Sequence, residues 1–230
     1  TLLFNRVIAL EIKMEIFWKD VSFDAARILH TPHEINKRRD ELIEKFVYGI
    51  PELHREEMRK GKYISGAGCL ATSAILALYP LVKEDVIETK HIVVDSKVGS
   101  SASGSKPDLA DMHAERSNVV RAYKPSFHRH TGEMEQELSF NGVKPVISFS
   151  PHAVDLVRGI LSTCHVFLNK DLTEKNVWQI YRKYYSEEPF IRIVKERDGI
   201  YRYPEPKLLA GTNYCDIGFE RDENSNRLVV

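Results

Sequence analysis

The 230-residue chain has few cysteines, no net charge and no long apolar run. Its three cysteines, Cys69, Cys164 and Cys215, cannot all pair with one another, and they show no metal-ligand spacing. This usage favours a reducing, cytoplasmic setting over a secreted one. Lysine plus arginine and aspartate plus glutamate each number 33, so no overall field attracts nucleic acid or an anionic membrane.

The sequence also lacks membrane spans, repeats and nucleotide-binding fingerprints. Its apolar start, residues 1–10, is too short and interrupted to cross a membrane, and no small-residue cleavage site follows it. No G-x-G-x-x-G follows a strand and opens a helix, and GSSASGSK at 99–106 only approaches a Walker loop. With 43% hydrophobic and 29% charged residues, the composition is that of an ordinary soluble globular protein.

Hydrophobic periodicity predicts alternating helices and strands, with strands prominent in the second half. We expect helices at 51–60, at 69–79 with Pro80 as its end, at 132–138 with Thr131 as its cap, and at 171–186, where Asp171 precedes Glu174 in a capping pattern. Strands are expected at 91–95, 144–150, 164–168, 190–194 and 211–219, and a Gly/Ser loop at 96–107. The mixture indicates an α+β or α/β fold.

Cys69 lies between a glycine-rich approach and an apolar helical stretch, in SGAGCLATSAILALYP. Gly66 and Gly68 let the backbone turn sharply and approach a ligand closely. The following helix directs its unpaired N–H groups and positive dipole end toward the thiol, which favours a thiolate nucleophile. The alternative is a small buried cysteine in a packed turn.

Two histidines form a second candidate group in KPSFHRHTGEMEQEL, residues 124–138. In an extended segment His128 and His130 project to one face. A histidine at a helix entrance tends to stay neutral, which suits proton exchange with a thiol. Two alternatives remain: the histidines could be half of a metal site, or they could be a surface pair without a special role. No further Cys/His cluster supports a metal.

The Gly/Ser loop is a third candidate. Its backbone N–H groups could cradle a phosphate, or the loop could be an ordinary surface loop.

The ordered blocks from residue 40 to residue 230 resemble the N-acetyl-gamma-glutamyl-phosphate reductase family. They include GAGCLAT, GSSASG, HAERS, KPSFHRHTGEMEQEL, SFSPHAVDLVRGIL and GTNYCDIGF. Three of them are most similar to the archaeal and Thermus-type branch, whose members reduce aminoadipate or glutamate phosphate attached to a small acidic amino-group carrier protein. The family's usual proline before Gly-Cys and aromatic after it are replaced by Ala67 and Leu70. This departure weakens the case for plain acetylglutamyl phosphate.

The resemblance implies thioester chemistry with NADPH as the hydride donor. Cys69 would attack the acyl phosphate, and His130, with His128 on the substrate side, would move protons, the two roles being interchangeable on sequence alone. The resemblance further suggests four phosphate or carboxylate contacts, Ser100, Ser101, Arg116 and Arg158, and places Gly66 and Gly68 near the cofactor. Arg158 in VDLVRGIL would serve equally as a surface ion pair.

The resemblance also implies two domains and an oligomer. Residues 1–68 would be a remnant of an α/β nucleotide-binding domain with an incomplete cofactor site. Residues 69–230 would be a glyceraldehyde-3-phosphate dehydrogenase-like catalytic and oligomerisation domain, with a large, mostly antiparallel mixed sheet and helices on one face. The apolar ends of the chain suggest part of a larger protein. We expect a homodimer or homotetramer in the cytoplasm that binds neither nucleic acid nor membrane.

Three other functions stay open on the sequence. A related semialdehyde dehydrogenase would use the same cysteine on another acyl phosphate. A truncated domain would only bind substrate or dimerise, without catalysis. A metal-binding module is the most distant alternative.

Overall fold

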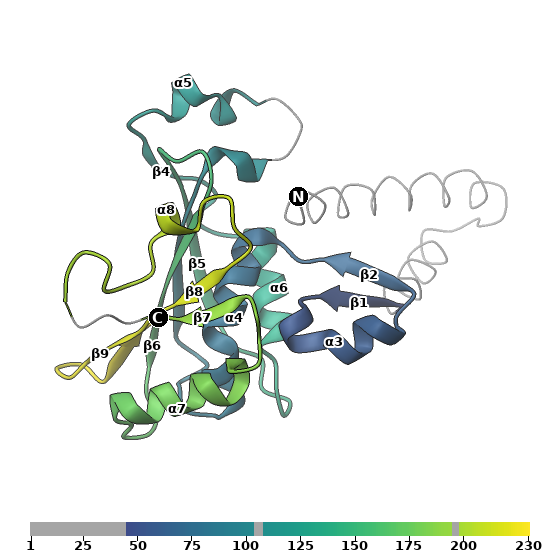
Figure 1. The fold of residues 1–230 in the computed structure, drawn as a ribbon, viewed down its shortest axis with the longest axis vertical. Coiled ribbons are helices and arrows are strands. Elements are labelled where there is room, and N and C mark those ends of the chain that lie inside the picture. The colour runs from purple at the N-terminus through teal and green to yellow at the C-terminus, as the bar shows by residue number, and fades with distance from the viewer. Residues whose placement is uncertain (1–44, 104–107, 195–197) are drawn as a thin grey trace. The chain divides into compact units, whose positions relative to one another are not determined.

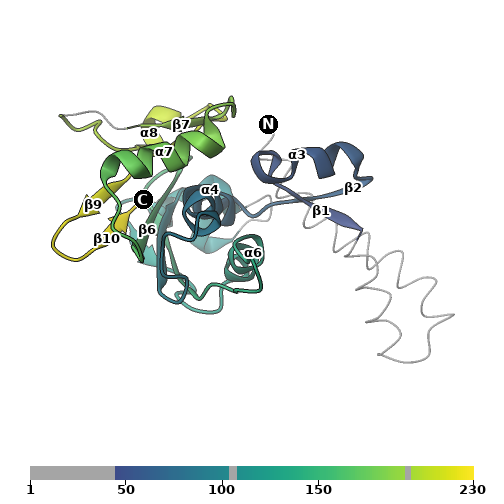
Figure 2. The same cartoon turned by 90° about the horizontal axis from the view of Figure 1, so that it is seen from below.

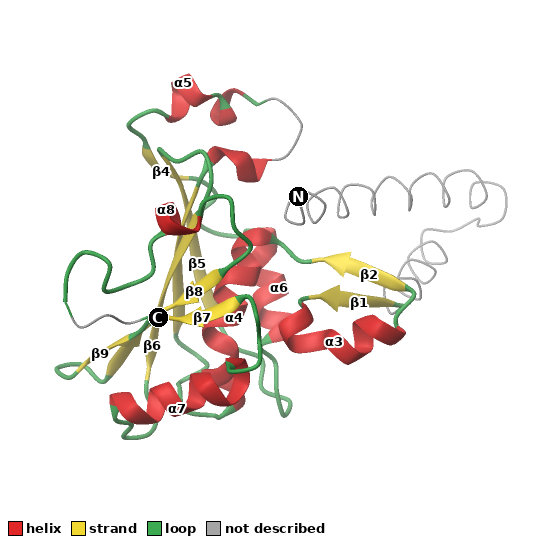
Figure 3. Ribbon diagram, in the orientation of Figure 1, coloured by secondary structure: helices red, strands yellow, loops and turns green. Residues whose placement is uncertain are grey.

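The computed structural model describes residues 45–103, 108–194 and 198–230. The chain divides into two compact units, Thr1–Cys69 (unit 1) and Leu70–Val230 (unit 2). Figure 1 labels most of the helices and strands, and Figure 3 colours them by type. The expectations for residues 1–44 lie outside the described residues.

The described part of unit 1 is a β–α–β motif. Strands β1 (Phe46–Gly49) and β2 (Tyr63–Gly66) pair in parallel, with α3 (Pro51–Lys60) as the crossover between them. Pro51 occupies the first helical turn, where its missing N–H costs nothing, and Gly61 follows the last residue. The predicted helix at 51–60 is therefore confirmed.

Unit 2 is built on a six-stranded sheet in the order β4-β5-β3-β6-β10-β9. The strands are β3 (Ile92–Val98), β4 (Val120–Ala122), β5 (Ile147–Val154), β6 (Ile160–Phe167), β9 (Glu220–Asp222) and β10 (Arg227–Val229). Only β3 and β5 pair in parallel, and every other pair in this sheet is antiparallel. The expected mostly antiparallel mixed sheet is confirmed.

Three helices cover one face of this sheet: α4 (Cys69–Lys83), α6 (Arg129–Glu137) and α7 (Glu174–Tyr185). Strand alternation directs Phe149, Val94 and Cys164, paired across β5, β3 and β6, to the buried face. The ring of His128, which precedes α6, lies 5.2 Å from that of Phe149. Helix α7 packs on α4, because Tyr181 donates a hydrogen bond of 2.6 Å to the Ala77 carbonyl. Figure 2 shows α4 and α6 nearly end-on beside each other.

Helix α4 continues through Pro80 to Lys83, so the predicted end at Tyr79 is wrong. A proline inside a helix leaves the carbonyl four residues earlier without its N–H donor. That carbonyl belongs to Leu76, and it accepts a 2.7 Å hydrogen bond from the buried hydroxyl of Tyr185. A side chain of α7 thus replaces the missing backbone donor.

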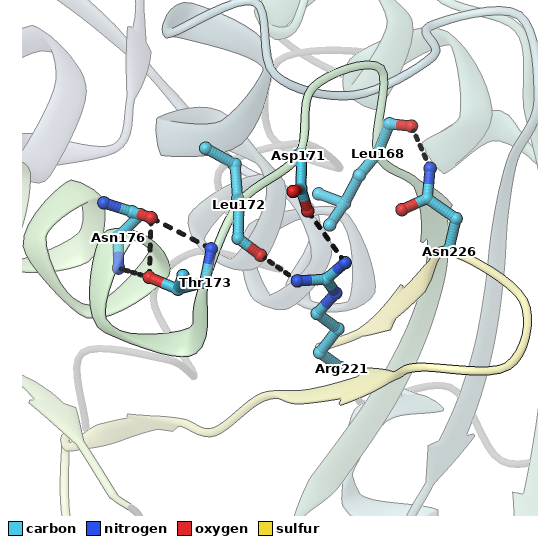
Figure 4. Close-up of polar contacts among 7 residues, drawn as sticks. All are labelled: Leu168, Asp171, Leu172, Thr173, Asn176, Arg221 and Asn226. Carbon is cyan, nitrogen blue, oxygen red and sulfur yellow. Dashed lines mark hydrogen bonds and ion pairs between the residues drawn. The ribbon is translucent and has the colours of Figure 1, made fainter.

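Helix α7 begins two residues later than its predicted cap. Thr173, not Asp171, is the N-cap, and it forms a reciprocal capping box with Asn176 (Figure 4). The Asp171 carboxylate instead pairs with Arg221 at 3.0 Å, and Arg221 also donates to the Leu172 carbonyl. Asp171, which the local sequence pattern predicted as the cap, is therefore paired with a residue distant in the chain.

The remaining elements are short. Strands β7 (Ile191–Ile193) and β8 (Cys215–Ile217) form a separate parallel pair, and α5 (His113–Arg116) and α8 (Pro206–Leu209) are single turns. Residues 96–98, expected in the Gly/Ser loop, belong to β3, and 100–103 form a 3-10 turn. Residues 104–107 of that loop lie outside the described residues. Among the described helices, none has the length and apolarity needed to span a membrane.

Candidate active site

Cys69 is the first residue of α4 and is partly exposed. Ala67 and Gly68 connect the end of β2 directly to this helix. Cys164, by contrast, is fully buried on β6, and burial raises the pKa of its thiol to about 12. That environment keeps Cys164 protonated and unreactive. Cys215 is partly exposed on β8.

The two histidines lie together at the start of α6, with ring centroids 4.6 Å apart. Their proximity does not come from an extended segment: His128 is the N-cap and His130 is in the first turn. Thr131 is therefore inside the helix, and its predicted capping role is wrong. The Nδ1 atom of His128 accepts the backbone N–H of His130 at 3.2 Å, so His128 carries no proton on Nδ1.

Both imidazoles are held neutral by their surroundings. Burial, followed by the charge of Arg129, lowers the pKa of His130 to about 4. Burial, then His130 and Arg129, lowers the pKa of His128 to about 4. The His130 side chain is 95% buried, and its Nε2 atom lies 3.9 Å from the Glu133 carboxylate. A neutral imidazole can accept a proton, which is the property that a base beside a thiol requires.

Helices α4 and α6 run in the same direction along the sheet. At their carboxyl ends, Tyr79 and Lys83 of α4 both contact the ring of Phe140, three residues beyond α6. The Tyr79 and Phe140 centroids are 5.5 Å apart, and the Lys83 ammonium is 4.3 Å from the same ring. The carboxyl ends of the two helices are therefore adjacent.

Their amino ends lie over neighbouring positions of the sheet. Ser73, in the second turn of α4, contacts Ser162 of β6, which pairs with Ser96 of β3. His128 contacts Phe149 of β5, which pairs with Val94 of β3. Val94 is the residue before Ser96 on the same face of that strand. Ser96 lies in the carboxyl half of β3, so α4 begins toward the carboxyl end of that strand. Phe149 is the third residue of β5, so α6 begins over the amino half of β5 on the same face of the sheet. Ligands of α/β sheets commonly bind outside the carboxyl ends of parallel strands, the end at which α4 begins.

The loops after β3 and β5 bring three of the predicted substrate contacts together. The backbone N–H groups of Ser100 and Ser101 donate to the carbonyls of Leu156 and Val157, both at 2.9 Å. Arg158, exposed and next in the chain, lies in that same loop. These two N–H groups already have carbonyl partners, so they do not contribute to a phosphate cradle, and residues 104–107 of the predicted loop lie outside the described residues. The serine hydroxyls and the Arg158 guanidinium are the groups that a ligand could still contact.

Arg116 is the fourth predicted contact, and it is almost completely buried, at 4% exposure. Its Nε and Nη1 atoms have no hydrogen-bond partner in the structure. The adjoining turn is tied to the loop after β5, because the Asn118 N–H donates to the Asp155 carboxylate at 2.8 Å. A buried guanidinium with two unpaired donors suits a planar anion such as a carboxylate or phosphate.

Three serines were not predicted from the sequence. Ser96, Ser162 and Ser73 form a hydrogen-bonded series beneath the first turns of α4. The available signal was the position of Ser96, which alternates with the apolar residues Val94 and Val98 of β3. A hydroxyl at such a position requires a polar partner when it is buried.

The other predicted positions are less informative. Gly66 ends β2 and the buried Gly68 precedes α4, both in unit 1. Among the described side chains, no group of three or more His, Cys, Asp or Glu residues is placed to hold a metal ion. The assignment of 1–68 and 69–230 to cofactor and catalytic domains stays a prediction.

Curated relatives resemble the chain over most of its length. It is 50% identical, over 219 residues, to a protein of Cenarchaeum symbiosum named as a LysW-L-2-aminoadipate/LysW-L-glutamate phosphate reductase, covering 92% of this chain and 62% of that protein. It is 50% identical over 196 residues to a LysW-L-2-aminoadipate 6-phosphate reductase of Thermomicrobium roseum, covering 84% of this chain and 56% of that protein. The chain thus spans little more than half the length of these relatives.

Solved structures show the same fold at low identity. The aspartate semialdehyde dehydrogenase of Francisella tularensis has a TM-score of 0.61 at 12% identity, covering 80% of this chain and 64% of that chain. The Vibrio cholerae aspartate semialdehyde dehydrogenase II, complexed with ASA, has a TM-score of 0.58 at 14% identity, covering 81% and 61%. The α+β fold that the resemblance implied is therefore confirmed.

One family covers most of the chain. Residues 69–230 match the family described as "Semialdehyde dehydrogenase, dimerisation domain". This stretch begins at Cys69 and includes the whole six-stranded sheet, both histidines and all four predicted substrate contacts. The chain belongs to the semialdehyde dehydrogenase dimerisation-domain family.

Proposed function

We propose that the protein containing this chain reduces an acyl phosphate to a semialdehyde through a thioester on Cys69. The observation that carries the proposal is that α4 and α6 begin on the same face of the sheet, over neighbouring positions of β3 and β5. One helix begins with a partly exposed cysteine and the other with two neutral histidines.

In this proposal the Cys69 thiolate attacks the carbonyl carbon of the acyl phosphate. A sulfur–carbon bond forms, the bond from that carbon to the phosphate oxygen breaks, and inorganic phosphate leaves. Neutral His130 accepts the thiol proton and later returns a proton to the sulfur or the nascent alkoxide. The Nδ1 contact to the backbone fixes the orientation of the His128 ring beside it.

Arg116 would hold the anionic part of the substrate. Burial strengthens its electrostatic attraction, and its two unpaired donors match the two oxygens of a carboxylate or phosphate. Ser100, Ser101 and Arg158 would add hydroxyl and guanidinium contacts from the loops after β3 and β5. We place Arg116 foremost, because Arg158 is exposed.

The substrate class follows from the names of the relatives, which specify LysW-linked aminoadipate and glutamate phosphates. We propose an acyl phosphate carried on such a small acidic protein, in lysine or arginine biosynthesis, with N-acetylglutamyl phosphate as the alternative. Comparing turnover of the carrier-linked and acetylated substrates decides between them. We also propose a reducing, cytoplasmic location, because three cysteines without metal-ligand spacing are typical of that compartment.

We propose NADPH as the cofactor, and one solved relative of this fold, from Candida albicans, is described with NADP. When bound, the reduced nicotinamide supplies the hydride that converts the thioester to the semialdehyde. The described part of unit 1 offers a parallel β–α–β motif, which fits a nucleotide-binding fold. The chain contains no G-x-G-x-x-G turn, so we expect NADPH binding weaker than micromolar. Isothermal titration of the chain with NADPH measures this directly, and a micromolar dissociation constant would contradict it.

Phosphate release in a single turnover, without NADPH, tests the thioester step. About one phosphate per chain is expected from the wild type and from a Cys215→Ser control, and none above background from Cys69→Ser. Release by Cys69→Ser equal to the control would reject Cys69 as the nucleophile. No release from any variant, together with substrate binding, would favour the alternative of a domain that only binds.

A further inference from the structure

A series of three serine hydroxyls connects the centre of the sheet to the first turn of α4. The Ser96 and Ser162 hydroxyl oxygens are 2.7 Å apart, and those of Ser162 and Ser73 are 2.6 Å apart. Ser73 in turn donates to the carbonyl of Leu70 at 3.0 Å. All three hydroxyls lie on the sheet face that α4 covers, because Ser96 and Ser162 are cross-strand partners.

The donor at every step follows from proton counting. A hydroxyl has one hydrogen, and Ser73 uses its hydrogen on the Leu70 carbonyl. Ser162 must therefore donate to Ser73, and Ser96 must donate to Ser162. All three O–H dipoles point the same way and end at the first turn of α4. Hydrogen bonds arranged head to tail polarise one another.

The Leu70 carbonyl and the Ala71 N–H belong to the same peptide group. A hydrogen bond to the carbonyl oxygen draws charge from that group and makes its N–H a stronger donor. The Ala71 N–H is one of the first-turn donors without an intrahelical partner, and such donors point toward the helix start, where Cys69 lies.

We propose that Ser73, Ser162 and Ser96 are positioning residues that fix and polarise the Leu70–Ala71 peptide, so that its N–H stabilises the Cys69 thiolate. This inference rests on the proposed function, in which Cys69 is the nucleophile. The serines touch no substrate and act only through the peptide.

The burial of Ser96 argues that the series has a use beyond packing. Ser96 is fully buried at a central position of β3, where its same-face neighbours are the apolar Val94 and Val98. A buried hydroxyl is costly unless it is hydrogen-bonded, whereas an apolar side chain would carry no such cost.

The test measures alkylation of Cys69 by iodoacetamide against pH, followed by mass spectrometry of the Cys69 peptide, in a Cys215→Ser background. Ser73→Ala should slow alkylation at pH 7 roughly threefold to tenfold and move the profile midpoint upward, because it removes the contact to Leu70. Ser162→Ala should have a smaller effect and Ser96→Ala the smallest. Ser73→Thr keeps the hydroxyl and should restore reactivity, and Ser148→Ala, on the exposed side of β5, should match the background.

Thermal unfolding of the same variants separates positioning from packing. If the serines only contribute to packing, the loss of Cys69 reactivity should increase with the burial of the substituted serine. Ser96→Ala would then show the largest loss in both alkylation and thermal stability. That order, or unchanged alkylation in Ser73→Ala, would overturn the inference while leaving Cys69 as the nucleophile. A wild-type Cys69 that reacts no faster than a cysteine in a free peptide would instead overturn the proposed function, and the inference with it.

Discussion

The start of α6 holds two imidazoles in an environment that disfavours their charge. His130 is nearly buried and its Nδ1 atom has no hydrogen-bond partner in the structure, while Arg129 adds a positive charge nearby. His128 must keep Nδ1 unprotonated to accept the His130 N–H. A proton on either ring therefore works against the folded state, and both rings stay neutral at neutral pH.

This environment predicts a pH dependence of stability. The pKa of His130 falls from an unfolded value near 6.5 to about 4 on folding. The unfolded chain therefore binds more protons between these values, so stability is full above pH 6.5 and is lost as the pH falls toward 4. The His130 contribution is at most about 3 kcal/mol, from the free energy of a pKa shift of this size.

Urea unfolding from pH 4.5 to 7.5 measures this contribution. His130→Gln cannot titrate, so the difference in unfolding free energy between wild type and variant should shrink as the pH falls through the window. Two curves that stay parallel across the range would show that His130 is not held neutral by the fold.

Helix α4 shows how one element depends on another. Pro80 leaves the Leu76 carbonyl without a helical donor, and the hydroxyl of Tyr185, 109 positions away in the chain, supplies it. Tyr181, one turn earlier on α7, bonds the next carbonyl, that of Ala77. Two tyrosines thus stabilise the stretch of α4 that a proline weakens.

The arrangement predicts a coupling between Pro80 and Tyr185. Tyr185→Phe should cost about 1–3 kcal/mol, because it leaves a buried carbonyl unsatisfied. In a Pro80→Ala background the restored N–H bonds Leu76, so the same change should cost clearly less. Chemical unfolding of the four combinations measures the coupling.

Tyr181→Phe is the matched control for this cycle. Tyr181 donates to the carbonyl of Ala77, and Pro80 does not remove the helical donor of that carbonyl. Pro80→Ala should therefore not reduce the cost of Tyr181→Phe. Equal costs of Tyr185→Phe in both backgrounds would mean that Tyr185 does not substitute for the missing N–H.

For unit 2 as a whole, the two faces of the sheet differ. One is covered by α4, α6 and α7, whereas the other carries Val93, 40% exposed on the central strand β3. Beside it, Asp95 pairs with Lys97 at 2.7 Å and with His152 at 3.2 Å, all partly buried. A single exposed apolar side chain is common on protein surfaces, so an interface on this face is inferred chiefly from the family description, which names a dimerisation domain.

We therefore predict that the protein forms at least a dimer through this second face, in keeping with the description of its family as a dimerisation domain. Val93→Asp should raise the dimer dissociation constant at least tenfold, because it buries an unpaired charge. Sedimentation equilibrium measures the constant. Val143→Asp, at an exposed site in a loop, is the control and should leave it unchanged.

The sequence alone determined much of this protein. The glycines and apolar residues around Cys69 and the apolar strands expected at 91–95 and 144–150 are local patterns, and local backbone geometry converts them into a helix start and buried strands. The family resemblance rested on the same ordered motifs. For this reason the fold and the candidate nucleophile were both accessible before any coordinates.

Only the tertiary structure decided how polar groups are paired. It extended α4 through Pro80 and moved the cap of α7 from Asp171 to Thr173. It also paired the backbone N–H of Ser100 with a carbonyl of another loop, and it left Arg116 buried with unpaired donors. In the first three cases the partner atom comes from another element or competes with one. A buried hydrogen bond depends on where distant chain segments meet, and no local pattern specifies that meeting.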